Sequence, residues 1–327
     1  MNQPAGPLEE ILRGEIRRGG PIPFHRFMEA ALYHPEHGYY RHPRDPFGAG
    51  GDFFTAEQVQ PVFGILVAAV IRAWFEEAGA PADFTVVELG AGRREMAAAL
   101  SAWRYVPVDL DAGALPERFR GVVFSNEFFD ALPVDAAVWS AGAFRELRVG
   151  VEGDRFVWVR GGEASPEVAA YLERYFPAPE EGRLYEAGLA ALAWMERVAA
   201  ALESGWVFTI DYGYTQAEWV RFPRGTLMSY RRHTAREQVL EQPGMQDVTA
   251  HVAFTALQEH GRARGLETVR FENLARTLLA AGEADQFRAA LSAPSSQEEI
   301  RRRLQLKTLL FGMGETYRTL IQRQAEK

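Results

Sequence analysis

The sequence Phe84-Thr85-Val86-Val87-Glu88-Leu89-Gly90-Ala91-Gly92 decides the fold class of this chain. The β-branched and aromatic residues at its start predict a buried strand, and the two glycines that follow predict a tight turn. The next run, 93–100, predicts a helix. A strand, a Gly-x-Gly turn and a helix are typical of α/β folds in which the backbone approaches a bound nucleotide. A tight turn without a ligand is the alternative.

Two acidic residues near this turn favour a bound nucleotide. Glu88 lies two residues before Gly90, where an acid suits a ligand that carries an ammonium group. Asp109 ends the next apolar run and follows Gly90 by 19 residues, close to the spacing of about 20 at which an acid meets ribose hydroxyls. Arg94 and Glu95 stand where a dinucleotide fingerprint has its third glycine. The pattern therefore fits S-adenosylmethionine better than NAD.

The composition is that of an ordinary globular protein. The 327 residues, 47% hydrophobic and 24% charged, suffice for two domains or one large decorated domain. The formal net charge of −8 argues against general binding to nucleic acid or to an anionic membrane. The absence of cysteine excludes disulfides, thiolate zinc sites and cysteine nucleophiles. No apolar run reaches the length of a membrane helix and no signal-peptide pattern begins the chain, so the expected location is cytoplasmic.

Apolar periodicity predicts an α/β protein with a decorated core. The first 83 residues are expected to form a helical cap with a lid, and 84–327 the α/β core with an insertion at about 134–204. The Pro/Gly-rich loop 41–51 suits a lid, although an ordinary connection is equally compatible with it. Helices are predicted at 8–17, 23–32, 57–78, 252–264, 272–281 and 296–310, strands at 121–125 and 206–211, antiparallel strands within 134–160, a helical insertion at 166–203 and a closing antiparallel strand at 313–322.

Several distinct motifs follow one another along most of the chain. They are Leu32-Tyr33-His34-Pro35, Gly51-Asp52-Phe53, Glu88-Leu89-Gly90-Ala91-Gly92-Arg93, Asn126-Glu127-Phe128-Phe129-Asp130-Ala131-Leu132-Pro133, Ile210-Asp211-Tyr212-Gly213 and Asp247-Val248-Thr249-Ala250-His251. Together they resemble the MidA family of S-adenosylmethionine-dependent methyltransferases, which includes a mitochondrial factor that methylates an arginine during assembly of respiratory complex I. The resemblance implies a Rossmann-like methyltransferase sheet, S-adenosylmethionine as cofactor and a protein arginine as methyl acceptor.

The chain departs from the family pattern at the adenine side. Only residues 110–120 separate the second strand from the strand 121–125. A methyltransferase normally fits a helix and a third strand there, and their loop holds the adenine. Eleven residues are too few for a helix and a strand with their turns. We therefore expect weakened adenine recognition, and a methyltransferase-like scaffold that binds protein partners without catalysis is the alternative function.

The candidate site residues follow the ends of predicted strands. The expected cofactor-binding residues are Glu88, Gly90, Gly92, Asp109 and Asp52. The expected catalytic residues are Asn126, Glu127 and Asp130, because carboxylates can pair with the guanidinium of an acceptor arginine. Asp211 is a further candidate for pairing with the guanidinium. A helix start capped by Asn126 is the alternative interpretation of that segment. We expect a protein substrate and no metal, nucleic acid or membrane partner.

Overall fold

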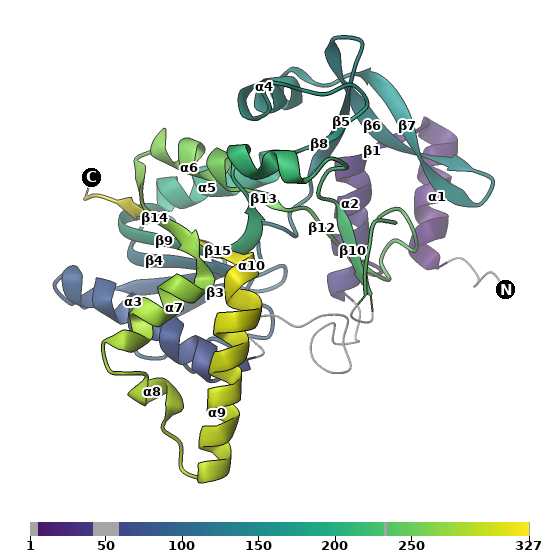
Figure 1. Cartoon of the computed structure of the whole chain (residues 1–327). Helices are drawn as coiled ribbons and strands as arrows, with labels where there is room; N and C mark the ends of the chain where they lie inside the picture. Colours follow the sequence, from purple (N-terminus) through teal and green to yellow (C-terminus); the bar gives the residue numbers. More distant parts are fainter. Residues whose placement is uncertain (1–5, 42–58, 232–233, 327) are drawn as a thin grey trace. The chain divides into compact units, whose positions relative to one another are not determined.

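The computed structural model describes residues 6–41, 59–231 and 234–326, and these form two compact units (Figure 1). Unit 1 consists of residues 1–54, 129–192 and 214–255, and unit 2 of residues 55–128, 193–213 and 256–327. Each unit is therefore assembled from three separate parts of the chain. The division into a cap, 1–83, and a core, 84–327, stays a prediction about domains. The predicted lid loop and Asp52 lie outside the described residues.

Unit 2 contains a mixed sheet in the strand order β14-β15-β9-β4-β2-β3. The neighbours β3, β2, β4 and β9 are parallel, whereas β15 is antiparallel to both β9 and β14. This arrangement confirms the Rossmann-like sheet and the antiparallel strand near the C-terminus. The strands are β2 (Thr85–Leu89), β3 (Arg104–Val108), β4 (Phe119–Asn126), β9 (Leu202–Tyr214), β14 (Leu266–Asn273) and β15 (Tyr317–Gln324).

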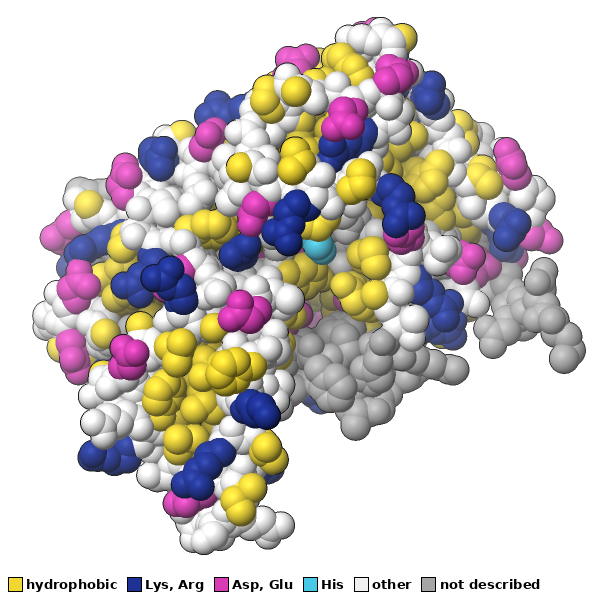
Figure 2. Space-filling view, viewed as in Figure 1, with side chains coloured by type: hydrophobic (Ala, Val, Ile, Leu, Met, Phe, Trp, Pro, Cys, Tyr) yellow, Lys and Arg dark blue, Asp and Glu magenta, His cyan; other side chains and the backbone are white. Residues whose placement is uncertain are grey.

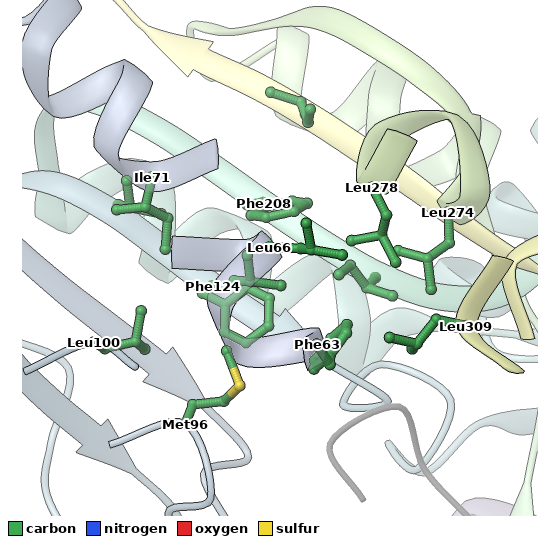
Figure 3. Close-up of a cluster of buried hydrophobic side chains, with 14 of the residues drawn as sticks. Phe63, Leu66, Ile71, Met96, Leu100, Phe124, Phe208, Leu274, Leu278 and Leu309 are labelled. Carbon is green, nitrogen blue, oxygen red and sulfur yellow. The ribbon is translucent and has the colours of Figure 1, made fainter. Parts of the chain in front are cut away.

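The core of unit 2 lies between this sheet and the helices α3 (Val62–Glu77) and α7 (Leu274–Glu283). Figure 3 shows Phe63 and Leu66 of α3 close to Phe124 and Phe208 of the sheet. Each fully buried side chain of this size contributes about 1.5–3 kcal/mol to folding. All five residues of β2 are buried, as expected for a parallel strand that is covered on both faces. Helix α6 (Phe254–Arg262) lies on the other side of the sheet in Figure 1.

The helix predicted at 93–100 is wrong, because this segment is a series of turns. Arg94 has a φ of 59°, a left-handed conformation that a continuing α-helix does not contain. The amide of Ala97 bonds to the Arg94 carbonyl at 3.0 Å, a spacing of three residues, and one bond from Leu100 N–H to the Met96 carbonyl has helical spacing. The glycine turn is therefore not followed by the N-terminus of a regular helix.

The sheet ends at β3, as the short connection after it predicts. Between β3 and β4 the structure shows turns and one bridge between Asp109 and Ala112, without a helix or a further strand in the described segment 109–118. The predicted shortening of the adenine side is thus confirmed in the fold. Weaker recognition of adenine stays a prediction.

Unit 1 has its own antiparallel sheet, ordered β1-β6-β5-β8 with β7 paired to the other edge of β6. The strands predicted within 134–160 are confirmed, but they form this separate sheet and do not join the parallel one. The segment predicted as a helical insertion also contains a strand, β8. Helices α1 and α2 pack on the sheet through Leu12, Phe27 and their neighbours. The elements are α1 (Pro7–Gly19), β1 (Ile22–Pro23), α2 (Phe24–Tyr33), β5 (Asp135–Ser140), β6 (Ala143–Glu152), β7 (Arg155–Glu163), α4 (Pro166–Tyr175) and β8 (Leu184–Ala187).

Several smaller elements complete the two units. A three-stranded sheet in unit 1, ordered β11-β10-β12, was not predicted. The remaining elements are η1 (Tyr39–Arg41), α5 (Leu189–Ala201), η3 (Gln216–Arg221), β10 (Met228–Arg231), β11 (Thr234–Arg236), β12 (Asp247–Thr249), β13 (Val252–Ala253), α8 (Arg288–Leu291), α9 (Ser296–Thr308), the π-helix η4 (Leu309–Met313) and α10 (Gly314–Thr316).

Helix α9 confirms the prediction at 296–310 but lies on the surface. It has no buried side chain, and Ile300 and Leu304 are 57% and 61% exposed. Figure 2, viewed as Figure 1, shows hydrophobic side chains on the surface around the position of α9. Among the described helices, none has the length and hydropathy needed to span a membrane.

Candidate functional site

Most of the predicted site residues in unit 2 follow the carboxyl ends of its parallel strands. Strands β2, β3 and β4 end at Leu89, Val108 and Asn126, and their register is parallel. In a parallel sheet these ends lie at the same edge, which is where open α/β sheets bind ligands. The glycine turn, Asp109 and Glu127 therefore come from three neighbouring strands.

The glycine turn is fixed to the end of β3. The amides of Gly90 and Ala91 donate to the Val108 carbonyl at 2.9 and 3.3 Å. Gly90 has a φ of 70° and Gly92 a φ of 46°, both in the left-handed region that favours glycine. A Cβ atom on Gly90 would lie 3.0 Å from Cδ2 of Phe128. Only glycine thus fits at position 90 without displacing this ring.

Asp109 lies against the same turn. Its Oδ2 accepts a hydrogen bond from the Gly92 amide, and its Oδ1 accepts one from the Leu110 amide at 2.6 Å. These two bonds fix the orientation of the carboxylate. Each carboxylate oxygen has a second lone pair, so Asp109 retains the capacity to accept hydrogen bonds from a pair of hydroxyls.

Glu88 is a buried carboxylate at the end of β2. It is 1% exposed, and its Oε2 accepts a hydrogen bond from the Tyr105 hydroxyl of β3. No local sequence pattern marks Tyr105 as a site residue, although Tyr105 lies in β3, the strand next to β2 in the sheet. The structure thus places Glu88 directly before the glycine turn, while its role toward an ammonium group stays a prediction.

Glu127 is held in place by backbone and side-chain bonds. Its φ of 51° is unusual for a residue other than glycine. Its amide donates to the Ile210 carbonyl at 3.0 Å. Its Oε1 accepts from Nδ2 of Asn126 at 3.3 Å, and its Oε2 accepts from the Tyr317 hydroxyl at 2.7 Å. The alternative of a helix capped by Asn126 is wrong, because 127–132 forms bends and turns.

Two tyrosines that the sequence analysis did not assign to the site lie beside Glu127. Tyr317 begins β15, and its ring meets the ring of Tyr212 edge-on with centroids 5.6 Å apart. The preceding acid, Asp211, is fully buried and its Oδ1 accepts the Tyr212 amide at 2.9 Å. Tyr212 belongs to a motif quoted above, whereas no local signal marks Tyr317, because strand pairing brings it to the site.

Asp130 belongs to unit 1, since the chain passes from unit 2 to unit 1 after Phe128. It is 4% exposed, and its carbonyl accepts the Ala250 amide at 3.0 Å. Burial raises the pKa of the Tyr40 hydroxyl well above its usual value, and the charges of Asp247 and Asp130 raise this pKa further. The Tyr40 hydroxyl donates to Oδ1 of Asp247 at 3.1 Å. Asp130 thus lies in a buried cluster of acids and tyrosines.

Unit 1 also buries a carboxyl group, Glu186 of β8, that the sequence analysis did not identify. Glu186 is 3% exposed, and its Oε1 accepts the Thr226 amide at 2.7 Å. Burial raises the pKa of Glu186 from 4.5 to about 7, against the opposing effect of backbone hydrogen bonds and of Arg183. The neighbouring Arg183 donates to the carbonyls of Trp219 and Phe222. Together the two side chains attach the segment 219–226 to the sheet of unit 1.

The raised pKa of Glu186 predicts a pH dependence of stability. Below pH 4.5 the group is protonated in both the folded and the unfolded state. Between pH 4.5 and about 7 only the folded state holds the proton, so the free energy of unfolding falls as the pH rises. The full difference corresponds to roughly 3 kcal/mol. Glu186→Gln should remove this pH-dependent contribution to the free energy of unfolding.

Urea unfolding of the wild-type protein and of Glu186→Gln at pH 4 to 8 measures the effect. The stability of the wild type relative to the variant should fall across this range and level off above about pH 7. Burial lowers the pKa of His251 to about 4, so His251 makes the free energy of unfolding rise with pH. The difference between the wild type and the variant cancels this contribution, because both proteins contain His251. A difference that does not change with pH would contradict the prediction.

The chain is similar to known methyltransferases. A sequence model of the S-adenosyl-L-methionine-dependent methyltransferase family Methyltransf_28 matches residues 102–272. Over 322 residues the chain is 26% identical to the mitochondrial protein arginine methyltransferase NDUFAF7 homolog of Drosophila melanogaster, covering 80% of this chain and 71% of that protein. Its identity to the human mitochondrial protein arginine methyltransferase NDUFAF7 is 25% over 320 residues, covering 80% and 70% of the two chains.

Two crystal structures from Burkholderia thailandensis resemble the whole chain. The first, of a protein bound to S-adenosyl-homocysteine, has a TM-score of 0.87 and 31% identity, and the match covers 100% of this chain and 96% of the other. The second, a native structure, has a TM-score of 0.84 and 30% identity with the same coverage. The similarity therefore includes both compact units and the segments that lead from one to the other.

Proposed function

The chain belongs to the S-adenosyl-L-methionine-dependent methyltransferase family Methyltransf_28, and from this premise we propose that it transfers a methyl group to arginine side chains of a protein. The curated relatives named above are protein arginine methyltransferases, and they support the choice of acceptor. The observation that carries the proposal is Glu127, a carboxylate with both oxygens oriented at the carboxyl edge of the parallel strands.

The residues of the glycine turn suit S-adenosylmethionine, which when bound supplies a methyl group activated by its sulfonium. Because Gly90 has no side chain, the backbone of the turn can approach a ligand closely, and a Cβ atom here would lie 3.0 Å from the Phe128 ring. Asp109 retains lone pairs for the two ribose hydroxyls. Glu88 is the acid that we expect to bind the ammonium group, and the Gly92 amide donates to Asp109.

The short adenine side does not argue against this proposal. The S-adenosyl-homocysteine-bound protein from Burkholderia thailandensis matches this chain over 96% of its own length. A protein of closely similar fold and extent therefore binds the methyltransferase product. We expect this chain to bind its cofactor too, with an affinity lowered by the contacts that a third strand would add.

An arginine acceptor requires a compensating negative charge. The guanidinium stays protonated in proteins, and burying it without a partner is strongly unfavourable. Its parallel N–H groups match the two oxygens of a carboxylate, which also fixes the plane of the guanidinium. We propose that Glu127 supplies this carboxylate and that its orientation directs one guanidinium nitrogen toward the methyl group. Asn126 and Asp130 are further candidates for contact with the acceptor.

Transfer of labelled methyl groups tests the proposed function. A protein extract incubated with the wild-type enzyme and methyl-labelled S-adenosylmethionine should yield labelled methylarginine after acid hydrolysis. Label in another amino acid would overturn the choice of acceptor. Binding of S-adenosyl-homocysteine together with no labelled protein would favour the scaffold that binds partners without catalysis.

A further inference from the structure

We propose that Tyr317 is a positioning residue, which orients the carboxylate of Glu127 for pairing with the guanidinium of the acceptor arginine. The inference rests on the proposed function and deepens it. Tyr317 lies outside the residues 102–272 that the family model matches. It reaches the site from the C-terminal strand β15.

The first support is the geometry of the carboxylate. The Tyr317 hydroxyl lies 2.7 Å from Oε2 of Glu127, and Nδ2 of Asn126 lies 3.3 Å from Oε1. The two donors therefore reach different oxygens of the same group. With one donor on each oxygen, rotation of the carboxylate about its terminal bond would break both hydrogen bonds.

The second support is that one carboxylate oxygen can accept two hydrogen bonds, because it has two lone pairs. A bond from Tyr317 or Asn126 and a bond from one N–H of a guanidinium can therefore share the same oxygen. A donor that orients Glu127 is thus compatible with bidentate pairing to an arginine.

The third support is the way in which Tyr317 is itself held. It pairs with Tyr212 in the register of β15 and β9, and the two rings meet edge-on at an interplanar angle of 83°. Glu127 is attached to the same strand, because its amide donates to the Ile210 carbonyl. The donor and the acceptor of the Tyr317–Glu127 bond are thus both fixed to β9. A hydroxyl fixed in this way loses little freedom when it forms the bond.

Tyr317→Phe removes the hydroxyl and keeps the ring. Turnover of labelled methyl groups should fall about 10- to 100-fold, the range of a lost hydrogen bond to a charged group, while binding of S-adenosyl-homocysteine stays unchanged. The matched control is Thr316→Ala, which removes the neighbouring hydroxyl whose bond goes to the Met313 carbonyl. This control should keep wild-type turnover. A turnover of Tyr317→Phe equal to that of the wild type would overturn the inference.

A double-mutant cycle separates positioning from a general structural role. If Tyr317 acts through Glu127, Tyr317→Phe should cause no further loss in a protein that already carries Glu127→Gln. The acidic limb of the rate profile of Tyr317→Phe should also move to higher pH, because the ionised carboxylate loses a donor. Additive losses with an unshifted pH profile would assign Tyr317 a role independent of Glu127.

A spectroscopic measurement distinguishes failure of this inference from failure of the proposed function. In protein labelled with ¹³C at glutamate carboxyl carbons, the Glu127 signal is assigned by its loss in Glu127→Gln. Its titration midpoint should move to higher pH in Tyr317→Phe and stay in place in Thr316→Ala. An unchanged midpoint would refute the positioning bond whatever the acceptor is. A shifted midpoint without arginine labelling by the wild type would refute the proposed acceptor alone.

Discussion

Replacing Gly90 by valine should abolish measurable binding of S-adenosyl-homocysteine while the protein stays folded. The new Cβ would lie 3.0 Å from Cδ2 of Phe128, so the valine side chain would displace this ring and cover the backbone of the turn that we expect the cofactor to approach. The φ of 70° at this position adds a strain of about 1–3 kcal/mol for a residue other than glycine. Isothermal calorimetry should detect no heat at ligand concentrations that saturate the wild type.

A matched glycine separates the blocked site from the backbone strain. Gly153, in the hairpin between β6 and β7, has a φ of 59°, and a Cβ atom at this position would meet no other side chain or distant backbone within 4 Å. Gly153→Val should therefore lose comparable stability but bind S-adenosyl-homocysteine as the wild type does. Equal binding by both variants would show that the turn at Gly90 does not receive the cofactor.

The strands and helices of the sheet core could be predicted because burial leaves a local pattern. The apolar residues of α3 repeat with helical spacing, and Val86 and Val87 precede Glu88 in β2, whose five residues are all buried. The segment 93–100 shows the limit of this reasoning. It contains good helix formers, but the left-handed Arg94 and the bonds that attach the glycine turn to β3 prevent a regular helix. Tertiary contacts override a weak local propensity.

The candidate site could be predicted only where its residues lie close in sequence to a strand end. Asp109 follows Gly90 by 19 residues and accepts the Gly92 amide, because one short crossover separates the two strands, while its contact with ribose hydroxyls stays a prediction. Tyr317 could not be found in this way, because it lies 190 residues from Glu127 and meets it through antiparallel pairing of β15. Pairing between distant strands is not encoded in any short window of sequence. The same limit applies to Glu186 and Thr226, which are 40 residues apart.

Glu127→Gln should lower methyl transfer at least about 100-fold, the upper range of a lost hydrogen bond to a charged group at roughly 3 kcal/mol. The substitution keeps the shape of the side chain and one oxygen. It removes the negative charge, so a guanidinium would be left underpaired in the site. Because Glu127 does not touch the glycine turn in any bond described above, binding of S-adenosyl-homocysteine should be nearly unchanged.

The measurement compares labelling of the same protein extract by the wild type, Glu127→Gln and Asp130→Asn. The matched control is Glu315→Gln, which neutralises an exposed acid two residues before Tyr317 and should label as the wild type does. Asp130 lies in unit 1 among Tyr40 and Asp247, and Asp130→Asn tests its predicted role in the reaction. Equal labelling by the wild type and both variants would remove Glu127 and Asp130 from the mechanism. The guanidinium stays protonated, so undiminished labelling would mean that neither carboxylate is needed to balance its charge.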